Sequence, residues 1–132
     1  MSLLYFEIAM GRFHEHADGY AWLRYHPGQR SLSDVQGFLT HTGRLLQRYD
    51  WHRVLSDQRL LLPFTEDERL LILNYWQTRQ VAYGPVTGAV VLSQDVFTRL
   101  SFSQIQQQAK GALVYRVFEE EAAAINWLSQ VV

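Results

Sequence analysis

The stretch GAVVLS at residues 88–93 decides the fold that the sequence predicts. Four apolar residues, Ala89 to Leu92, follow one another without a polar interruption, and two of them are β-branched. The run is too short for a helix and has the composition of a strand that is buried on both faces. Because such strands occur in the middle of parallel sheets, the sequence predicts an α/β protein built around this strand.

A helix is predicted directly before this strand. Thr65 and Glu68 have the spacing of a capping box, and the helix should run to about Tyr83, where Gly84-Pro85 ends it. Its apolar residues cover most of the circumference instead of one stripe, so a second surface must cover it.

The segments after the central strand continue the alternation. Residues 95–109 predict two short helical pieces with a break at 101–103, and residues 113–118 predict the last strand. The weak apolar stripe of the first segment consists of Val96, Phe97, Leu100 and Ile105. A final helix follows Glu119-Glu120-Glu121, whose carboxylates suit a helix start, and its apolar face is Ala124, Trp127, Leu128 and Val131.

The N-terminal half predicts a hairpin, a helix and a further strand. Apolar residues 3–10 and residues 20–26 read as two antiparallel strands, with residues 11–19 as the loop between them. Ser33 is the expected N-cap of an amphipathic helix, and residues 52–57 form a short strand that ends at Asp57. The helical apolar face consists of Val35, Phe38, Leu39, Thr42, Leu45, Leu46 and Tyr49.

The predicted order of elements is β-β-α-β-α-β-α-β-α. It describes one α/β domain over residues 1–132, with a mixed, mainly parallel sheet of about five strands. A length of 132 residues leaves room for one core, and 48% hydrophobic residues are enough to fill it.

Composition narrows the classes of function. A net charge of −1 with dispersed basic residues argues against nucleic acid as a partner, and no segment is apolar enough to predict a membrane span. The chain has no cysteine, which excludes disulfides and fits a cytoplasmic setting. No glycine-rich nucleotide motif and no catalytic constellation is visible, so we expect neither a cofactor nor an enzyme.

Several short motifs resemble the SpoIIAA-like group, relatives of the STAS fold of anti-sigma-factor antagonists. They are LSDQR at 55–59, VVLS at 90–93 before DVF at 95–97, and YRVF at 115–118 before EA at 121–122 and WL at 127–128. The resemblance implies a STAS-like, non-enzymatic interaction module in a bacterial regulatory setting. Signalling members carry a phosphorylatable Ser or Thr directly after an Asp at a strand end, whereas here Gln58 follows Asp57. STAS-like folds also resemble SEC14-type lipid-binding lobes, so a small apolar ligand or lipid is the alternative.

Two loops at the predicted carboxyl edge of the sheet carry polar residues. Asp57, Gln58 and Arg59 follow one strand, and Ser93 and Asp95 follow another, so these five side chains predict a shared polar crevice. The alternative is local: Asp57 pairs with Arg59 or caps backbone N–H groups, and Ser93 or Asp95 caps a helix.

His14, His16 and Asp18 have types and spacing that can hold a metal ion on an extended chain. No further ligand is evident in the sequence, and a polar loop explains the same residues, so we assign no metal ligand.

The helix over residues 66–83 predicts an interface. Its apolar surface exceeds what one sheet face covers, which is typical of self-association, so we expect a homodimer in which Leu71, Tyr75 or Trp76 contributes. Burial of this surface by neighbouring helices within the monomer is the alternative.

Overall fold

The computed structural model describes residues 2–109 and 111–131 and shows an α/β protein with one mixed sheet. Six strands and four helices follow the order β-β-β-α-β-α-β-α-β-α. The strands are β1 (Ser2–Ile8), β2 (Gly11–His16), β3 (Tyr20–Tyr25), β4 (Arg53–Asp57), β5 (Val86–Val91) and β6 (Leu113–Phe118). The helices are α1 (Leu32–Tyr49), α2 (Glu66–Tyr83), α3 (Val96–Gln108) and α4 (Glu121–Gln130).

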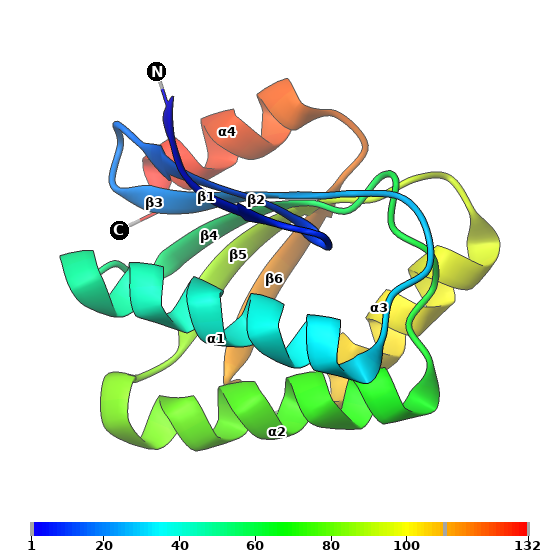
Figure 1. Ribbon diagram of the computed structural model, residues 1–132. Helices are drawn as coiled ribbons and strands as arrows, with labels where there is room; N and C mark the ends of the chain where they lie inside the picture. The colour runs from blue at the N-terminus through cyan, green and yellow to red at the C-terminus, as the bar shows by residue number, and fades with distance from the viewer. Residues whose placement is uncertain (1, 110, 132) are drawn as a thin grey trace.

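The strands lie in the sheet in the order in which they occur in the chain. β1, β2 and β3 form an antiparallel meander, and β3 to β6 run parallel to one another. Each parallel crossover steps to the next position in the same direction, so right-handed connections place all their helices on one face. Figure 1 shows α1, α2 and α3 beneath the sheet and α4 above it.

The N-terminal hairpin prediction was wrong in its pairing. Residues 11–16, expected as part of a loop, form β2, which lies between β1 and β3 and raises the number of strands to six. Phe13 of β2 is fully buried on the face of α1, whereas its neighbours His14 and His16 lie on the opposite face. Polar residues on the less covered face therefore concealed the strand from a reading of hydrophobicity.

Two helix predictions also need correction. α1 begins two residues earlier than expected: Ser31, not Ser33, is the N-cap, and its Oγ accepts the Asp34 backbone N–H at 3.1 Å. The Asp34 carboxylate in turn accepts a hydrogen bond from the Ser31 N–H at 2.8 Å, which completes a capping box. α3 is one continuous helix, without the break expected at 101–103.

Other elements agree with the prediction. Thr65 and Glu68 form the capping box of α2, which ends at Tyr83, and the last strand spans Leu113–Phe118. The central strand is buried on both faces, since Ala89, Val90 and Val91 have no exposed surface.

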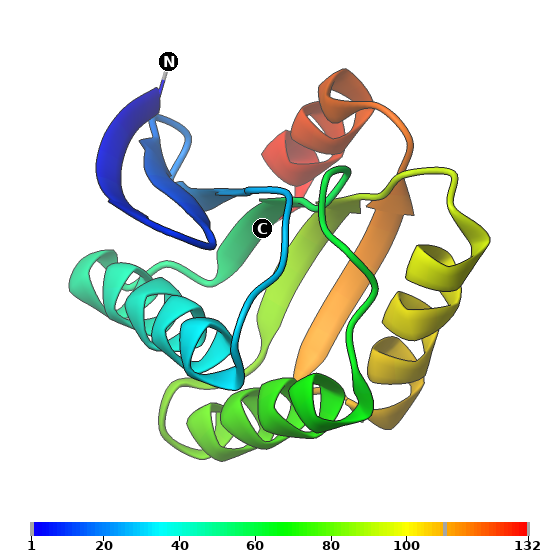
Figure 2. The same cartoon turned by 45° about the vertical axis from the view of Figure 1, so that its right-hand side comes forward.

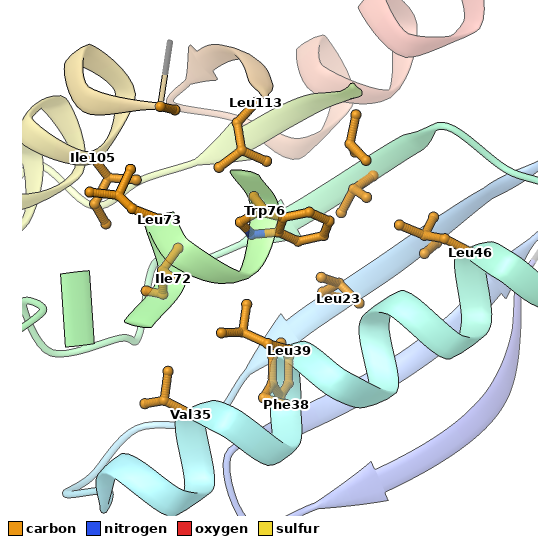
Figure 3. Close-up of a cluster of buried hydrophobic side chains, with 14 of the residues drawn as sticks. Leu23, Val35, Phe38, Leu39, Leu46, Ile72, Leu73, Trp76, Ile105 and Leu113 are labelled. Atoms are coloured by element: carbon orange, nitrogen blue, oxygen red, sulfur yellow. The ribbon is translucent and has the colours of Figure 1, made fainter. Parts of the chain in front are cut away.

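The larger of the two main apolar layers lies between the sheet and α1 to α3. Figure 3 shows Leu23, Leu46 and Leu113 around Trp76, so α2 sends its largest side chain toward the sheet. A smaller layer under α4 contains Tyr20, Leu55, Ala89, Val91, Ala124 and Leu128. Charged side chains lie at the carboxyl ends of the parallel strands, outside both apolar layers.

Candidate functional site

Four charged side chains meet at the carboxyl edge of the parallel strands, and we call them the edge cluster: Arg24, Asp57, Arg59 and Glu121. Arg59 holds Asp57 through two bonds, Nε to Oδ1 at 2.9 Å and Nη2 to Oδ2 at 2.7 Å. Glu121, at the start of α4, accepts Arg24 Nη2 at 3.2 Å and Arg59 Nη2 at 3.3 Å. The cluster therefore links β3, β4 and α4, and its four charges balance.

Pairing keeps Asp57 ionised although the residue is buried. Burial by itself opposes ionisation, but the hydrogen bonds from the Arg59 side chain and backbone and the charges of Arg59 and Arg24 outweigh it. The net effect lowers the pKa of Asp57 below its ordinary value, and the same bonds raise the pKa of Arg59. A carboxylate held in this state is a structural partner and is poorly suited to act as a general acid or base near neutral pH.

An open groove of about 510 Å³ lies beside the edge cluster. Glu7 supplies a further pair of contacts at its margin: Arg12 Nε donates to the Glu7 carboxylate at 2.9 Å, and His26 Nε2 lies 2.8 Å from it. The groove is lined by Arg12, Arg24, Tyr25, His26, Asp57, Arg59 and Leu60. Besides its arginines, the titratable side chains of this lining are Tyr25, His26 and Asp57.

The five predicted crevice residues separate into three places. Asp57 and Arg59 both line the groove. Gln58 is buried and lines a small internal cavity between the sheet and α1 to α3. Asp95 caps α3, because its Oδ2 accepts the Thr98 N–H at 2.8 Å, and Ser93 Oγ accepts the Asp95 N–H at 3.3 Å. The contacts thus match the local alternative of an ion pair and a helix cap. Arg24 and Glu121 were missed, because nothing in the sequence relates residues 97 positions apart.

The histidines of β2 are held by local contacts. His16 stacks on Tyr20 with ring centroids 4.2 Å apart, and its Nδ1 accepts the Asp18 backbone N–H at 3.1 Å. Burial is the main cause that lowers the pKa of both His14 and His16. Within residues 2–109 and 111–131, no group of three or more His, Asp or Glu side chains could hold a metal ion.

The predicted interface on α2 is only partly accessible. Trp76 is 5% exposed and belongs to the core, so it is not available for contact with a second molecule. Leu71 and Tyr75 are half-buried and pack against the same core. The neighbouring helices therefore cover much of the surface that suggested self-association.

Exposed apolar side chains occur on α2 itself, at Leu70, Val81 and Tyr83, and on the two segments that follow β4 and β5. We call the exposed apolar side chains of these two segments the apolar rim: Leu60, Leu62, Val96, Phe97 and Leu100. Val96 is 73% exposed and Phe97 71%, although both were expected to form the core-facing stripe of α3. Ser101 joins the two segments, since its Oγ accepts the Phe64 N–H at 3.1 Å. The signal that could have found the rim is the uninterrupted LLL at residues 60–62 in a loop.

The core has little empty space. The cavity that Gln58 lines, between the sheet and α1 to α3, measures about 30 Å³. That is room for one water molecule, whereas pockets for small apolar ligands measure ~300 Å³ or more. This cavity is therefore too small for a lipid.

Comparison with protein-family models, with curated proteins and with solved structures found no match to this chain. Among the described residues, none of the helices combines the length and the apolar character that a bilayer crossing requires.

Proposed function

We propose that this chain is a non-enzymatic, STAS-like interaction module that binds a protein partner through the apolar rim. The observation that carries the proposal is the exposure of five large apolar side chains at one edge of the sheet. Soluble monomers rarely leave such groups clustered, and clusters of this kind bordered by polar residues mark interaction surfaces.

The polar surroundings of the rim support a protein partner. Leu60 belongs both to the rim and to the groove that contains Asp57 and Arg59, so apolar and charged groups adjoin. Interfaces between proteins commonly combine an apolar centre with a polar margin that fixes orientation. A second copy of the chain is the simplest partner, and we place the module in a cytoplasmic, bacterial regulatory setting, on the basis of its composition and motifs.

Substitution of the rim tests the proposal. Phe97→Ser with Leu100→Ser should abolish partner binding while the free energy of unfolding changes by no more than about 0.5 kcal/mol, because exposed side chains contribute little to stability. Light scattering after size-exclusion chromatography measures self-association, and a photo-crosslinking amino acid at position 97 identifies any other partner by mass spectrometry.

Val81 provides the control, since it is 90% exposed but lies on α2, outside the rim. Val81→Ser should keep partner binding, and a photo-crosslinker at position 81 should not yield the product obtained at position 97. The proposal is wrong if the chain is monomeric and position 97 yields no specific product, or if the rim variant binds its partner as the wild type does.

A further inference from the structure

We propose that the groove between α1 and α2 is a binding site for an oxyanion, a carboxylate or a phosphate group, with Arg79 as its principal ligand. The site is separate from the apolar rim and does not depend on the proposed function. Figure 1 and Figure 2 both show α1 and α2 side by side beneath the sheet, away from α4.

Arg79 is a buried cation for which the described part of the chain supplies no anionic partner. The residue is only 8% exposed, and its Nη1 is fully buried with no hydrogen-bond acceptor. Within residues 2–109 and 111–131 no carboxylate forms an ion pair with it, in contrast to Arg30, which is similarly enclosed but donates to Glu68 at 2.8 Å. Buried guanidinium groups are almost always paired, because an uncompensated charge in the interior is costly.

Aromatic rings hold the guanidinium in place. Arg79 Cζ lies 4.9 Å from the ring centroid of Tyr83 and 5.9 Å from that of Trp76. These cation–π contacts fix the plane of the guanidinium but satisfy none of its N–H donors. Burial lowers the pKa of Arg79, which is the direction expected for a cation that lacks a counter-charge.

The groove around Arg79 has the size and charge for a small anion. It measures about 430 Å³ and its lining contains no acidic side chain. Arg44 and Gln47 of α1 and Tyr75 and Tyr83 of α2 add further donors to the lining. Arg44, Arg79 and Tyr75 all line this groove, and the Tyr75 hydroxyl and Arg79 Nε both lie next to Gly43. A planar guanidinium with a second cation and hydroxyl donors matches the oxygen atoms of a carboxylate or phosphate.

Gly43 of α1 makes this arrangement possible. A Cβ at this position would collide with the Tyr75 hydroxyl and would lie 3.6 Å from Arg79 Nε. The bare backbone of α1 therefore leaves the space that Tyr75 and Arg79 occupy at the floor of the groove.

Titration of the full-length chain with sodium phosphate and with sodium acetate, at constant ionic strength set with chloride, tests the proposal. Amide chemical shifts by NMR should change at Gly43 and Arg79 and saturate, and Arg79→Met should weaken binding at least about tenfold, because a charged hydrogen bond is lost. Arg116→Met removes one charge from an exposed position on β6 and should bind as the wild type does. Tighter binding of phosphate identifies a phosphoryl ligand, and tighter binding of acetate identifies a carboxylate.

Thermal unfolding provides a second measurement. In chloride alone, Arg79→Met should be at least as stable as the wild type, because the unpaired charge is gone. The effective anion should raise the Tm of the wild type and leave that of Arg79→Met unchanged. Arg79→Lys keeps the positive charge but lacks the planar guanidinium group, whose donors can bind two oxygen atoms at once. This variant should bind the anion more weakly than the wild type. The inference is overturned if neither anion shifts the Gly43 amide beyond the effect of chloride, or if Arg79→Met binds as tightly as the wild type.

Discussion

At the scale of single residues, Asp57 shows how one carboxylate joins β4 to β3 and to the loop that follows β4. It accepts two side-chain hydrogen bonds and one backbone hydrogen bond from Arg59 and lies 3.8 Å from Arg24, so its charge offsets two guanidinium groups at the edge of the sheet. Asp57→Asn keeps the size of the side chain but removes the charge, and an amide cannot accept both side-chain bonds from Arg59.

We expect Asp57→Asn to lower the free energy of unfolding by ~1–2 kcal/mol, less than a fully buried pair would lose, because Arg59 is solvent-accessible. Urea denaturation at pH 7 measures the change. Asp50→Asn is the matched control: Asp50 is exposed and has a left-handed backbone with φ of 53°, which Asn tolerates, so its effect should be small. Equal effects of the two substitutions would contradict the assigned role of Asp57.

At the scale of elements, the contact between α1 and α2 depends on Gly43, and Gly37 of the same helix provides a comparison in a different environment. Gly43 faces Tyr75 and Arg79, whereas a Cβ at Gly37 of the same helix would meet no atom within 4 Å. Alanine favours a helix over glycine at both positions, so only the surroundings distinguish them.

Gly37→Ala should raise the free energy of unfolding by up to about 1 kcal/mol. Gly43→Ala should lower it by ~1–3 kcal/mol, because the new methyl group collides with the Tyr75 hydroxyl. Adding Tyr75→Phe, which removes that hydroxyl, should recover part of the loss. Urea denaturation of the wild type and the three variants measures these differences, and a stabilising Gly43→Ala would show that α1 and α2 do not approach as closely as described.

At the scale of the whole molecule, the pH dependence of the free energy of unfolding is the sum of contributions from all groups whose pKa values folding shifts. His14 and His16 have a folded-state pKa below the ordinary value of 6.5, so below that pH the unfolded chain binds protons first and the folded state loses stability. Asp57, whose pKa lies below 3.8, contributes stability that is complete above that pH and is lost as the pH falls through its folded-state pKa.

The free energy of unfolding should therefore fall in two steps on acidification, first from about pH 6.5 downward and again below about pH 4. Urea denaturation between pH 8 and pH 3 measures both steps. His14→Phe should reduce the first step, whereas His52→Phe, at an exposed position, should leave it intact. If the free energy of unfolding of the wild type stays constant between pH 7 and pH 5, the partly buried His14 and His16 do not affect stability as expected.

Local sequence signals predicted most of the architecture. The capping box of Thr65 and Glu68, the apolar run at Ala89 and the last strand from Leu113 to Phe118 each depend on residues within a few positions of one another. Patterns of this length indicate the type of element, but they misplaced Val96 and Phe97, which were expected to face the core and are exposed. β2 was not predicted as a strand, because its polar side chains lie on a face that no helix covers completely. The alternation of Phe13 with histidines therefore resembled the sequence of a loop.

The sequence by itself therefore determined the class of fold and the alternation of helices with the parallel strands, and it left the pairing of Asp57 with its neighbour Arg59 as one of two alternatives. Only the tertiary structure decided that Glu121 contacts Arg59 and that Phe97 lies outside the core. It also decided that Arg79 is buried where the described residues provide no counter-charge. The physical reason is that propensity and periodicity act within one element. Contacts between charged side chains depend on strand register and helix packing, which bring together residues that are distant along the chain.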